Sequence, residues 1–303
     1  MKGQTLTRRA DNLLPAVLIL FAGILLFDMM GLIIKYLSPD YRAAELSAYR
    51  NLFGLIPSVL ALFWTPGWRS GGSSLRLRQW RLAIFRGVCV TFAQFSFYLS
   101  LGAMAFASAT TISYAMALFM TAFAVPILGE KVGPVRWFAV CIGFVGVIMV
   151  MNPGADTFQW IAVLPLIAAA LYAIAGVTSR LMDDDAPSAL MNLYSSAVSA
   201  VGAIALTLAT GGFSEMQSVE HLAWVVAMGA FGGAAVLCWV IAQRRTEQSN
   251  LAPFNYFGIP LAFALGWIFF GEAPFDDLFP GALLIAAGGL LILWRERRKQ
   301  AGH

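Results

Sequence analysis

Apolar residues fill this chain in ten long stretches joined by short polar segments. The stretches fall near residues 13–37, 44–65, 79–101, 105–128, 134–152, 158–181, 187–209, 219–243, 249–271 and 276–294. A bilayer core of roughly 30 Å is crossed by a helix of about 20 apolar residues. Every backbone polar group inside lipid needs a partner, and a helix provides one within its own segment. The pattern therefore predicts an all-α membrane protein with ten transmembrane helices.

The last five stretches repeat features of the first five. A shift of 142 residues, or of 145 near the start of each half, superimposes similar residues: Tyr114 on Tyr256, Gly129-Glu130 on Gly271-Glu272, and Lys35 on Arg180. Each half has an odd number of stretches, so the second half must enter the membrane from the opposite side. We therefore expect two inverted five-helix repeats, residues 1–152 and 153–303, around a central cavity. In membrane proteins this arrangement is associated with alternating-access transport.

Positive charge is distributed unevenly among the polar segments. Of the 20 lysines and arginines, 16 lie near the N-terminus, in alternate loops or near the C-terminus: Lys2, Arg8, Arg9, Arg69, Arg76, Arg78, Arg81, Lys131, Arg136, Arg180, Arg244, Arg245, Arg295, Arg297, Arg298 and Lys299. Basic residues gather on the cytoplasmic side of membrane proteins, so we expect both termini in the cytoplasm. The composition is 59% hydrophobic and 12% charged, which leaves little room for a soluble domain. The net charge of +4 thus reflects membrane topology and a lipid partner, not a nucleic-acid site.

Residues typical of catalysis and of metal binding are scarce. The two histidines are His221, near the start of a stretch, and His303, at the end of the chain. No zinc-protease, nucleophile-elbow or phosphate-loop motif occurs. The sequence therefore predicts a protein that is not an enzyme and has no cofactor or metal. A channel-like facilitator stays an alternative to a carrier, because the two have the same sequence features.

Asp28, Lys35 and Arg50 are charged residues within the first two stretches. Asp28 is nine residues, about 14 Å, from the outer end of the first stretch, and Lys35 lies two turns further on nearly the same face. Arg50 lies early in the second stretch. Charges inside the bilayer face a partner or a wet cavity. In one interpretation, the three groups bind the ammonium and carboxylate of an amino acid or relay a proton. In the other, they form a charge network that fixes helix packing.

Aromatic and amide side chains form a second candidate set, well inside several stretches: Gln94, Tyr98, Tyr114, Trp239, Asn255 and Tyr256. Flat apolar walls with a few hydrogen-bonding groups suit a medium-sized, partly apolar solute. We therefore predict that these residues line the substrate cavity. The alternative is aromatic packing between helices or against lipid. Tyr114 and Tyr256 stand out because the repeat relates them.

Glu130 and Glu272 end the fourth and ninth stretches. A carboxylate at a helix C-terminus opposes the helix dipole, so these two glutamates need another role, such as a gate or proton coupling. Three prolines lie within the same stretches and are predicted to interrupt them as hinges: Pro126, Pro253 and Pro260. Glycines in the fifth and tenth stretches, such as Gly146 and Gly288, permit close helix approach. These two stretches are thus candidates for a homodimer contact.

The chain resembles the drug/metabolite transporter superfamily, and within it the ten-helix carriers of the EamA type. The resemblance is strongest in two runs: Phe106 to Met151, with Pro126, Gly129-Glu130, Trp137, Gly143 and Gly146, and Leu251 to Arg295, with Tyr256, Pro260, Gly266-Trp267 and Gly271-Glu272. It implies a multi-pass protein of the bacterial inner membrane whose first, third, fourth, sixth, eighth and ninth spans line the cavity. Relatives with different substrates share the Gly-Glu pairs, which favours a gate or structural role. Phe27-Asp28 stands where Trp-Gly is common.

The resemblance is also to exporters of amino acids, including aromatic ones. The sequence thus predicts a carrier of small organic metabolites that works by alternating access. We favour amino acid export with a preference for aromatic or apolar side chains. The alternative is a carrier of drugs or of nucleotide-like metabolites such as S-adenosylmethionine, or a channel-like facilitator.

Overall fold

The computed structural model describes residues 13–63, 79–130, 132–151, 160–181, 188–245, 251 and 254–301, and within these ranges it contains no strand. The principal α-helices are α2 (Leu13–Leu37), α3 (Ala43–Phe63), α5 (Trp80–Ala103), α6 (Phe106–Ser113), α7 (Met116–Leu128), α8 (Pro134–Met151), α9 (Val163–Thr178), α10 (Ser188–Ala209), α11 (Val219–Arg245), α13 (Gly258–Phe270), α14 (Phe275–Leu278) and α15 (Gly281–Ala301). Short 3₁₀ turns, η1 (Trp160–Ala162) and η2 (Ser179–Leu181), flank α9. The predicted boundary between the two halves, at residues 152 and 153, lies outside the described residues.

The helices follow the apolar stretches of the sequence. Helix covers most of the described part of each stretch, and among the described residues six helical segments, one of them α6 and α7 together, are long and apolar enough to cross a membrane. Three shorter helical segments are also apolar: Leu193–Ala209, Gly258–Phe270 and Gly281–Ile292. Large apolar side chains such as Phe138, Ile148 and Ile268 point outward, which is the arrangement that lipid favours. The predicted all-α membrane fold is therefore confirmed, whereas the count of ten crossings and the side of the termini stay predictions.

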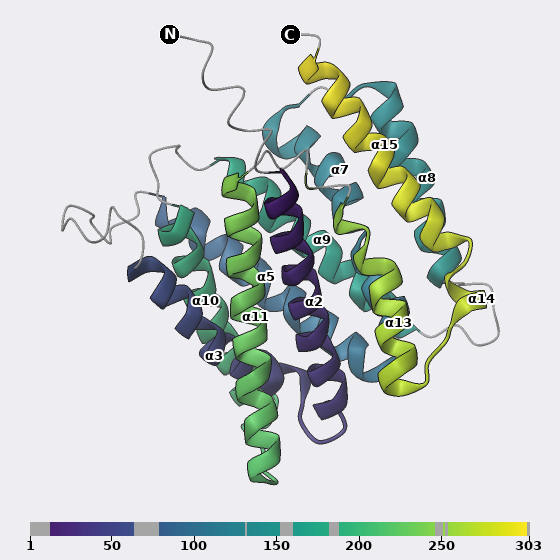
Figure 1. Cartoon of the computed structure of the whole chain (residues 1–303). Coiled ribbons are helices and arrows are strands. Elements are labelled where there is room, and N and C mark those ends of the chain that lie inside the picture. The colour runs from purple at the N-terminus through teal and green to yellow at the C-terminus, as the bar shows by residue number, and fades with distance from the viewer. Residues whose placement is uncertain are drawn as a thin grey trace.

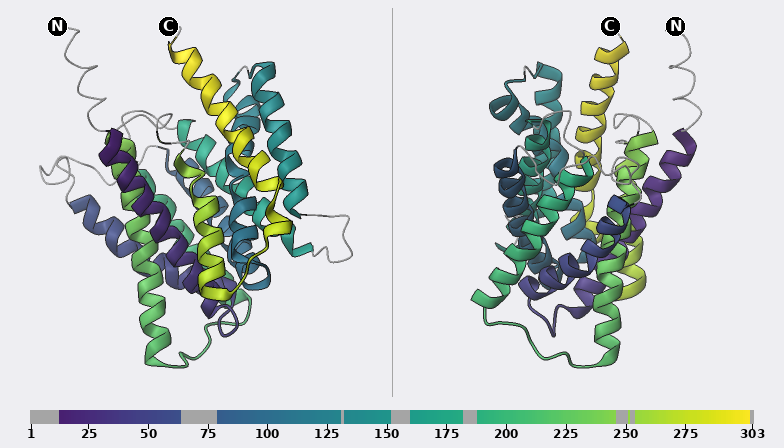
Figure 2. Two further views of the ribbon diagram at one scale, coloured as in Figure 1. Left: turned by 45° about the vertical axis from the view of Figure 1, so that its right-hand side comes forward. Right: turned by 90° about the vertical axis from the view of Figure 1, so that its left-hand side faces the viewer.

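The helices form one bundle (Figure 1). The helix α2 begins at the end of the bundle at which α15 finishes, and we call this the terminal end and its opposite the far end. The first helix of each half contacts the other half: α2 packs along α11, and α9 packs along α5 and α7. The helices α3, α5 and α10 pack against one another beside them. Two further views place α8 and α15 together at one side of the bundle (Figure 2).

The glycines of α8 and α15 bring these two helices into close contact within one chain. A methyl group on Gly146 would come within 2.5 Å of the Gly281 carbonyl oxygen. One on Gly288 would come within 2.7 Å of the Ala139 carbonyl oxygen. Small residues at a helix crossing let the backbones approach, so these positions serve the contact between α8 and α15. The glycines that suggested a homodimer thus form a contact between two helices of the same chain. The homodimer stays a prediction, and these glycines no longer support it.

Two helices are broken at positions that the repeat relates. The turn Tyr114–Ala115 separates α6 from α7, and the turn Tyr256–Phe257 precedes α13. Both turns contain short-range backbone bonds, from Ala115 N to Ile112 O at 3.0 Å and from Phe257 N to Phe254 O at 3.2 Å. Such tight turns inside a longer helical segment often mark a functional hinge. The breaks therefore lie at the two tyrosines.

The breaks therefore do not lie at Pro126 or Pro260, where interruptions were predicted. Pro126 lies inside α7, which continues to Leu128, and Pro260 lies in the first turn of α13. Proline is tolerated in a first helical turn because the backbone N–H there has no partner within the helix. Pro253 lies outside the described residues. A hinge role for the three prolines stays a prediction.

A second repeat-related feature ends these spans. Gly129 and Gly271 cap α7 and α13 in the left-handed conformation, with φ of 69° and 65°. The N–H groups of Glu130 and Glu272 then return to carbonyl oxygens of the preceding helix, at 3.3 and 3.2 Å. Glycine adopts a positive φ without the steric cost of a Cβ. The cap explains the glycine of each Gly-Glu pair and leaves the glutamate side chain free to reach another helix.

Candidate functional site

A cavity of about 150 Å³ lies beside the break at Tyr114. Its wall is formed by one face of α2 together with residues from the α6–α7 turn, α11 and the segment before α13: Leu20, Gly23, Ile24, Phe27, Asp28, Tyr114, Trp239 and Asn255. Four of the nine predicted substrate-binding residues therefore meet here: Asp28, Tyr114, Trp239 and Asn255. They come from helices of both halves. The wall is apolar and aromatic with few polar groups, as expected for a small-molecule site.

Asp28 is the charged group of this wall. Its side chain is only 6% exposed, and its Oδ2 atom has no hydrogen-bond partner. A buried carboxylate without a partner is costly, because it has lost its hydration and gained nothing in exchange. Neither Lys35 nor Arg50 forms an ion pair with Asp28, so the predicted charged trio does not assemble.

The two repeat-related tyrosines lie against each other. The rings of Tyr114 and Tyr256 are 5.9 Å apart between centroids, at an angle of 36°. The Tyr114 hydroxyl packs against Gly258 and occupies the space that a Cβ atom at this position would need. The Tyr256 hydroxyl is buried against Gly289 and has no hydrogen-bond partner. Tyr256 therefore supports Tyr114 from behind, and it is Tyr114 that reaches the cavity.

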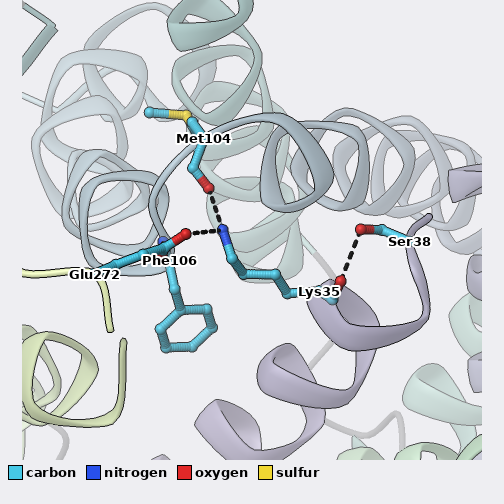
Figure 3. Close-up of polar contacts among 5 residues, drawn as sticks. All are labelled: Lys35, Ser38, Met104, Phe106 and Glu272. Atoms are coloured by element: carbon cyan, nitrogen blue, oxygen red, sulfur yellow. Dashed lines mark hydrogen bonds and ion pairs between the residues drawn. The ribbon is translucent and has the colours of Figure 1, made fainter. Parts of the chain in front are cut away.

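Lys35 lies at the far end of the bundle, where it joins the two halves (Figure 3). Its Nζ atom is 2.8 Å from Glu272 Oε1 and donates a hydrogen bond of 2.6 Å to the Met104 carbonyl oxygen. The other carboxylate oxygen of Glu272 accepts a hydrogen bond of 3.0 Å from the Phe106 N–H. The ring of Phe270 lies 5.3 Å below the ammonium.

The dipoles of the neighbouring helices favour this arrangement. Met104 follows the C-terminus of α5, whose carbonyl groups attract a cation, and Phe106 begins α6, whose N–H groups attract an anion. Lys35 and Glu272 are 12% and 29% exposed, so the pair is largely shielded from water. The contact therefore ties the ends of α2, α5, α6 and α13 together.

A second ion pair lies at the terminal end. Arg180 Nη2 is 2.5 Å from Glu130 Oε1, and the two side chains are 57% and 30% exposed. Arg180 is the repeat counterpart of Lys35, and Glu130 is the counterpart of Glu272. Each pair thus joins the first helix of one half to the end of the fourth helix of the other. In the described part of the chain, one such cross-half pair lies at each end of the bundle.

Gln94 and Arg50 belong to a buried polar network, not to the cavity wall. Gln94 Oε1 accepts hydrogen bonds from Asn51 Nδ2 at 2.7 Å, from Ser47 Oγ at 3.2 Å and from Ser199 Oγ at 3.3 Å. Arg50 donates to Asn51 Oδ1 at 3.0 Å. These contacts link α3, α5 and α10, which is the helix-packing alternative considered for such residues. The Gln94 side-chain oxygen is thus already surrounded by donors, and contact between Gln94 and a solute stays a prediction.

Tyr98 is also placed away from the cavity. It is 2% exposed and packs in the core at the far end, with Ile34, Phe106 and Leu265. Five of the predicted residues therefore lie outside the wall of this cavity, and a substrate-binding role for them stays a prediction: Lys35, Arg50, Gln94, Tyr98 and Tyr256. The sequence places these residues within helices, but its periodicity does not show which face of a helix lines the cavity.

Several residues of the site had not been singled out from the sequence. Leu20, Gly23 and Ile24 form the wall on the same face of α2 as Asp28. Leu20, Ile24 and Asp28 are each four residues apart, about one helical turn, so this spacing could have identified the first two from the sequence. Arg180 had a clearer signal, since its alignment with Lys35 already suggested an equivalent role. The backbone groups of Met104 and Phe106 have no side-chain signature, so only the structure could identify them.

Comparison with known proteins gives the family. The model of the EamA-like transporter family matches residues 14–152 and again residues 159–294. The chain belongs to this family. The resemblance to the drug/metabolite transporter superfamily is thereby confirmed. This EamA-like transporter is a multi-pass protein of the bacterial inner membrane and not an enzyme.

The EamA-like transporter is similar over most of its length to bacterial carriers. It is 28% identical over 257 residues to the riboflavin transporter of Rhizobium johnstonii, covering 80% of this chain and 83% of that protein. It is 24% identical over 267 residues to the S-adenosylmethionine uptake transporter of Rickettsia bellii, covering 87% and 88%. A solved crystal structure with 22% identity has a TM-score of 0.64 over 94% of this chain and 98% of that chain, and it supports the fold alone.

Proposed function

We propose that this protein carries a small organic metabolite with a flat ring across the inner membrane by alternating access. The observation that supports this is the cavity beside the α6–α7 break, with Asp28, Tyr114 and Trp239 in its wall. Broken helices at the interface of two repeats are where transporters bind substrate. A channel-like facilitator would need a continuous path, whereas the cross-half ion pairs lie at both ends of the bundle.

We further propose that Glu130 and Glu272 act as gates. Because the halves are related by the repeat, exchanging their conformations would open one end of the bundle while the other stays closed. The pair Lys35–Glu272 joins the halves at the far end, and Arg180–Glu130 joins them at the terminal end. Opening either end requires breaking its pair. Proton coupling through these carboxylates is the alternative that a pH gradient tests.

Two classes of solute satisfy the proposal. Amino acid export is favoured by the sequence resemblance, and an aromatic side chain suits the walls formed by Phe27, Tyr114 and Trp239. A nucleotide-like metabolite is favoured by the names of the relatives, which are riboflavin and S-adenosylmethionine transporters. Aromatic amino acids and nucleotide-like metabolites both have a flat ring. Transport direction follows from the gradients, since the same alternation moves solute either way.

Counterflow in proteoliposomes tests the function directly. The purified chain is reconstituted in vesicles preloaded with unlabelled phenylalanine, tryptophan, riboflavin or S-adenosylmethionine, and the entry of the same labelled solute is followed. We expect saturable counterflow of at least one of the four. Empty vesicles without protein and a poor-fit solute such as glutamate are the controls.

The outcome also separates the two classes and the coupling. Counterflow of phenylalanine or tryptophan would support an amino acid carrier, and counterflow of riboflavin or S-adenosylmethionine would support the nucleotide-like class. Faster movement under an imposed pH gradient would support coupling through a buried carboxylate. If a folded, reconstituted sample moves none of the four solutes, the proposal of a carrier for flat-ring metabolites fails.

A further inference from the structure

The charge of the cavity wall carries information about the solute. Of the eight wall residues that the structure describes, Asp28 alone has an acidic or basic side chain. The carboxylate is more than nine-tenths buried, and Oδ2 has no hydrogen-bond partner. When Asp28 is ionised, it repels anions and attracts cations, more strongly in a dry site than in water. The cavity therefore has an unpaired place for positive charge.

The two basic side chains of α2 and α3, Lys35 and Arg50, are engaged elsewhere. Lys35, two turns along α2, is bound to Glu272 and to the Met104 carbonyl oxygen. Arg50 donates to Asn51 and lies near Gly232 of α11. Neither side chain forms an ion pair with Asp28. The protein thus supplies no neutralising partner for this carboxylate from either of the cations in its first two helices.

The aromatic rings of the wall favour the same kind of ligand. Phe27 precedes Asp28 in α2, while Tyr114 and Trp239 enter from the other helices. A cation over an aromatic face is attracted by the ring quadrupole, by about 0.5–2 kcal/mol, and tryptophan is the best of the rings. The same rings can stack on a flat apolar group. Asn255 adds an amide that both donates and accepts hydrogen bonds.

We propose that the cavity at Asp28 binds the positively charged group of an organic cation, with the flat ring of the solute against Tyr114 and Trp239. This inference rests on the proposed function, because it names the charge of the solute carried. Among ring-bearing metabolites it selects amines and other cations over neutral and anionic molecules. Asp28 is then the group that decides specificity.

The test compares probes that share a ring and differ in charge. Binding to the full chain in nanodiscs is measured calorimetrically with 2-phenylethylamine, a cation, with phenylalanine, a zwitterion, and with 3-phenylpropionate, an anion. S-adenosylmethionine and S-adenosylhomocysteine form a second pair that differ by one methyl group and one positive charge. We expect the cation of each set to bind best, by about tenfold over the least positive member, which corresponds to about 1.4 kcal/mol.

Substitution of Asp28 distinguishes charge recognition from packing. Asp28→Asn keeps the shape and is expected to weaken cation binding about tenfold and to remove the preference between probes. Asp28→Glu retains the charge and is expected to keep the preference. Asp40→Asn changes an exposed carboxylate outside the cavity and serves as the matched control. Size-exclusion and melting profiles show that each variant is folded.

The results separate this inference from the proposed function. If the wild-type chain shows counterflow but binds cation and anion equally, or if Asp28→Asn keeps the full preference for cations, the cation site is wrong and the carrier proposal stands. If the cations bind with the expected preference and no solute shows counterflow, the site stands and the carrier proposal fails.

Discussion

Lys35→Glu is expected to slow transport about tenfold, equivalent to a shift of about 1.4 kcal/mol between conformations. The substitution replaces the ion pair of 2.8 Å with two facing carboxylates and sets an anion against the Met104 carbonyl oxygen. Both changes destabilise the closed far end, so the protein spends less time in the states that open toward the terminal end. The initial rate of counterflow measures the effect.

Companion variants separate charge from packing. Lys35→Arg retains the cation and is expected to keep most of the rate. The exchange Lys35→Glu with Glu272→Lys reverses both charges and is expected to restore only part of it, because a lysine at 272 cannot accept the hydrogen bond from Phe106 N–H. If Lys35→Glu transports as fast as wild type, the far-end pair is not a gate. The equivalent exchange of Arg180 and Glu130 tests the terminal end.

Gly258→Ala is expected to raise the half-saturation concentration for transport about tenfold. A methyl group at this position would overlap the Tyr114 hydroxyl, and it would also lie 3.2 Å from Ile24 Cγ2. The ring of Tyr114 must therefore move, and Tyr256 behind it limits the direction. Overpacking of this kind costs about 1–3 kcal/mol and changes the cavity wall. Concentration dependence of counterflow measures the shift.

The same substitution has two sharp controls. Adding Tyr114→Phe to Gly258→Ala removes the overlapping hydroxyl and is expected to recover part of the affinity. Gly133→Ala adds an identical methyl group where no atom lies within 4 Å, so it is expected to leave affinity unchanged. Wild-type affinity in Gly258→Ala would mean that the position of Tyr114 does not matter to the solute.

Much of the candidate site could be read from the repeat. The alignment of Tyr114 with Tyr256 and of Glu130 with Glu272 selected residues that lie at corresponding turns and caps. The partner of each glutamate was not predictable in the same way. Lys35 was grouped with Asp28 because the two share a helix face, yet its long side chain reaches across to Glu272. Face sharing within a helix says little about contacts that a flexible side chain makes with another helix.

The prolines and glycines show a related limit. Proline was expected to break the helices, but Pro260 lies in the first turn of α13. A backbone N–H there has no partner within the helix, so its absence in proline does not destabilise the helix. Glycine in α8 and α15 indicated close packing correctly, without saying whether the neighbour was the same chain or a second copy. A local signal reports what a residue permits, and the neighbouring helix decides how that freedom is used.

The sequence by itself determined that this is an all-helical membrane protein of the EamA-like family with two related halves. Hydropathy and residue spacing are enough for the helices and the two halves, because the bilayer demands long apolar helices whatever their arrangement, and the motifs of residues 106–151 and 251–295 carry the resemblance to the family. Only the tertiary structure decided that Asp28, Tyr114, Trp239 and Asn255 share one cavity, while Gln94 and Tyr98 serve packing. The described parts of α2 and α11 are largely apolar, and a row of polar residues does not mark the face of either that meets the cavity. That choice depends on which helices touch.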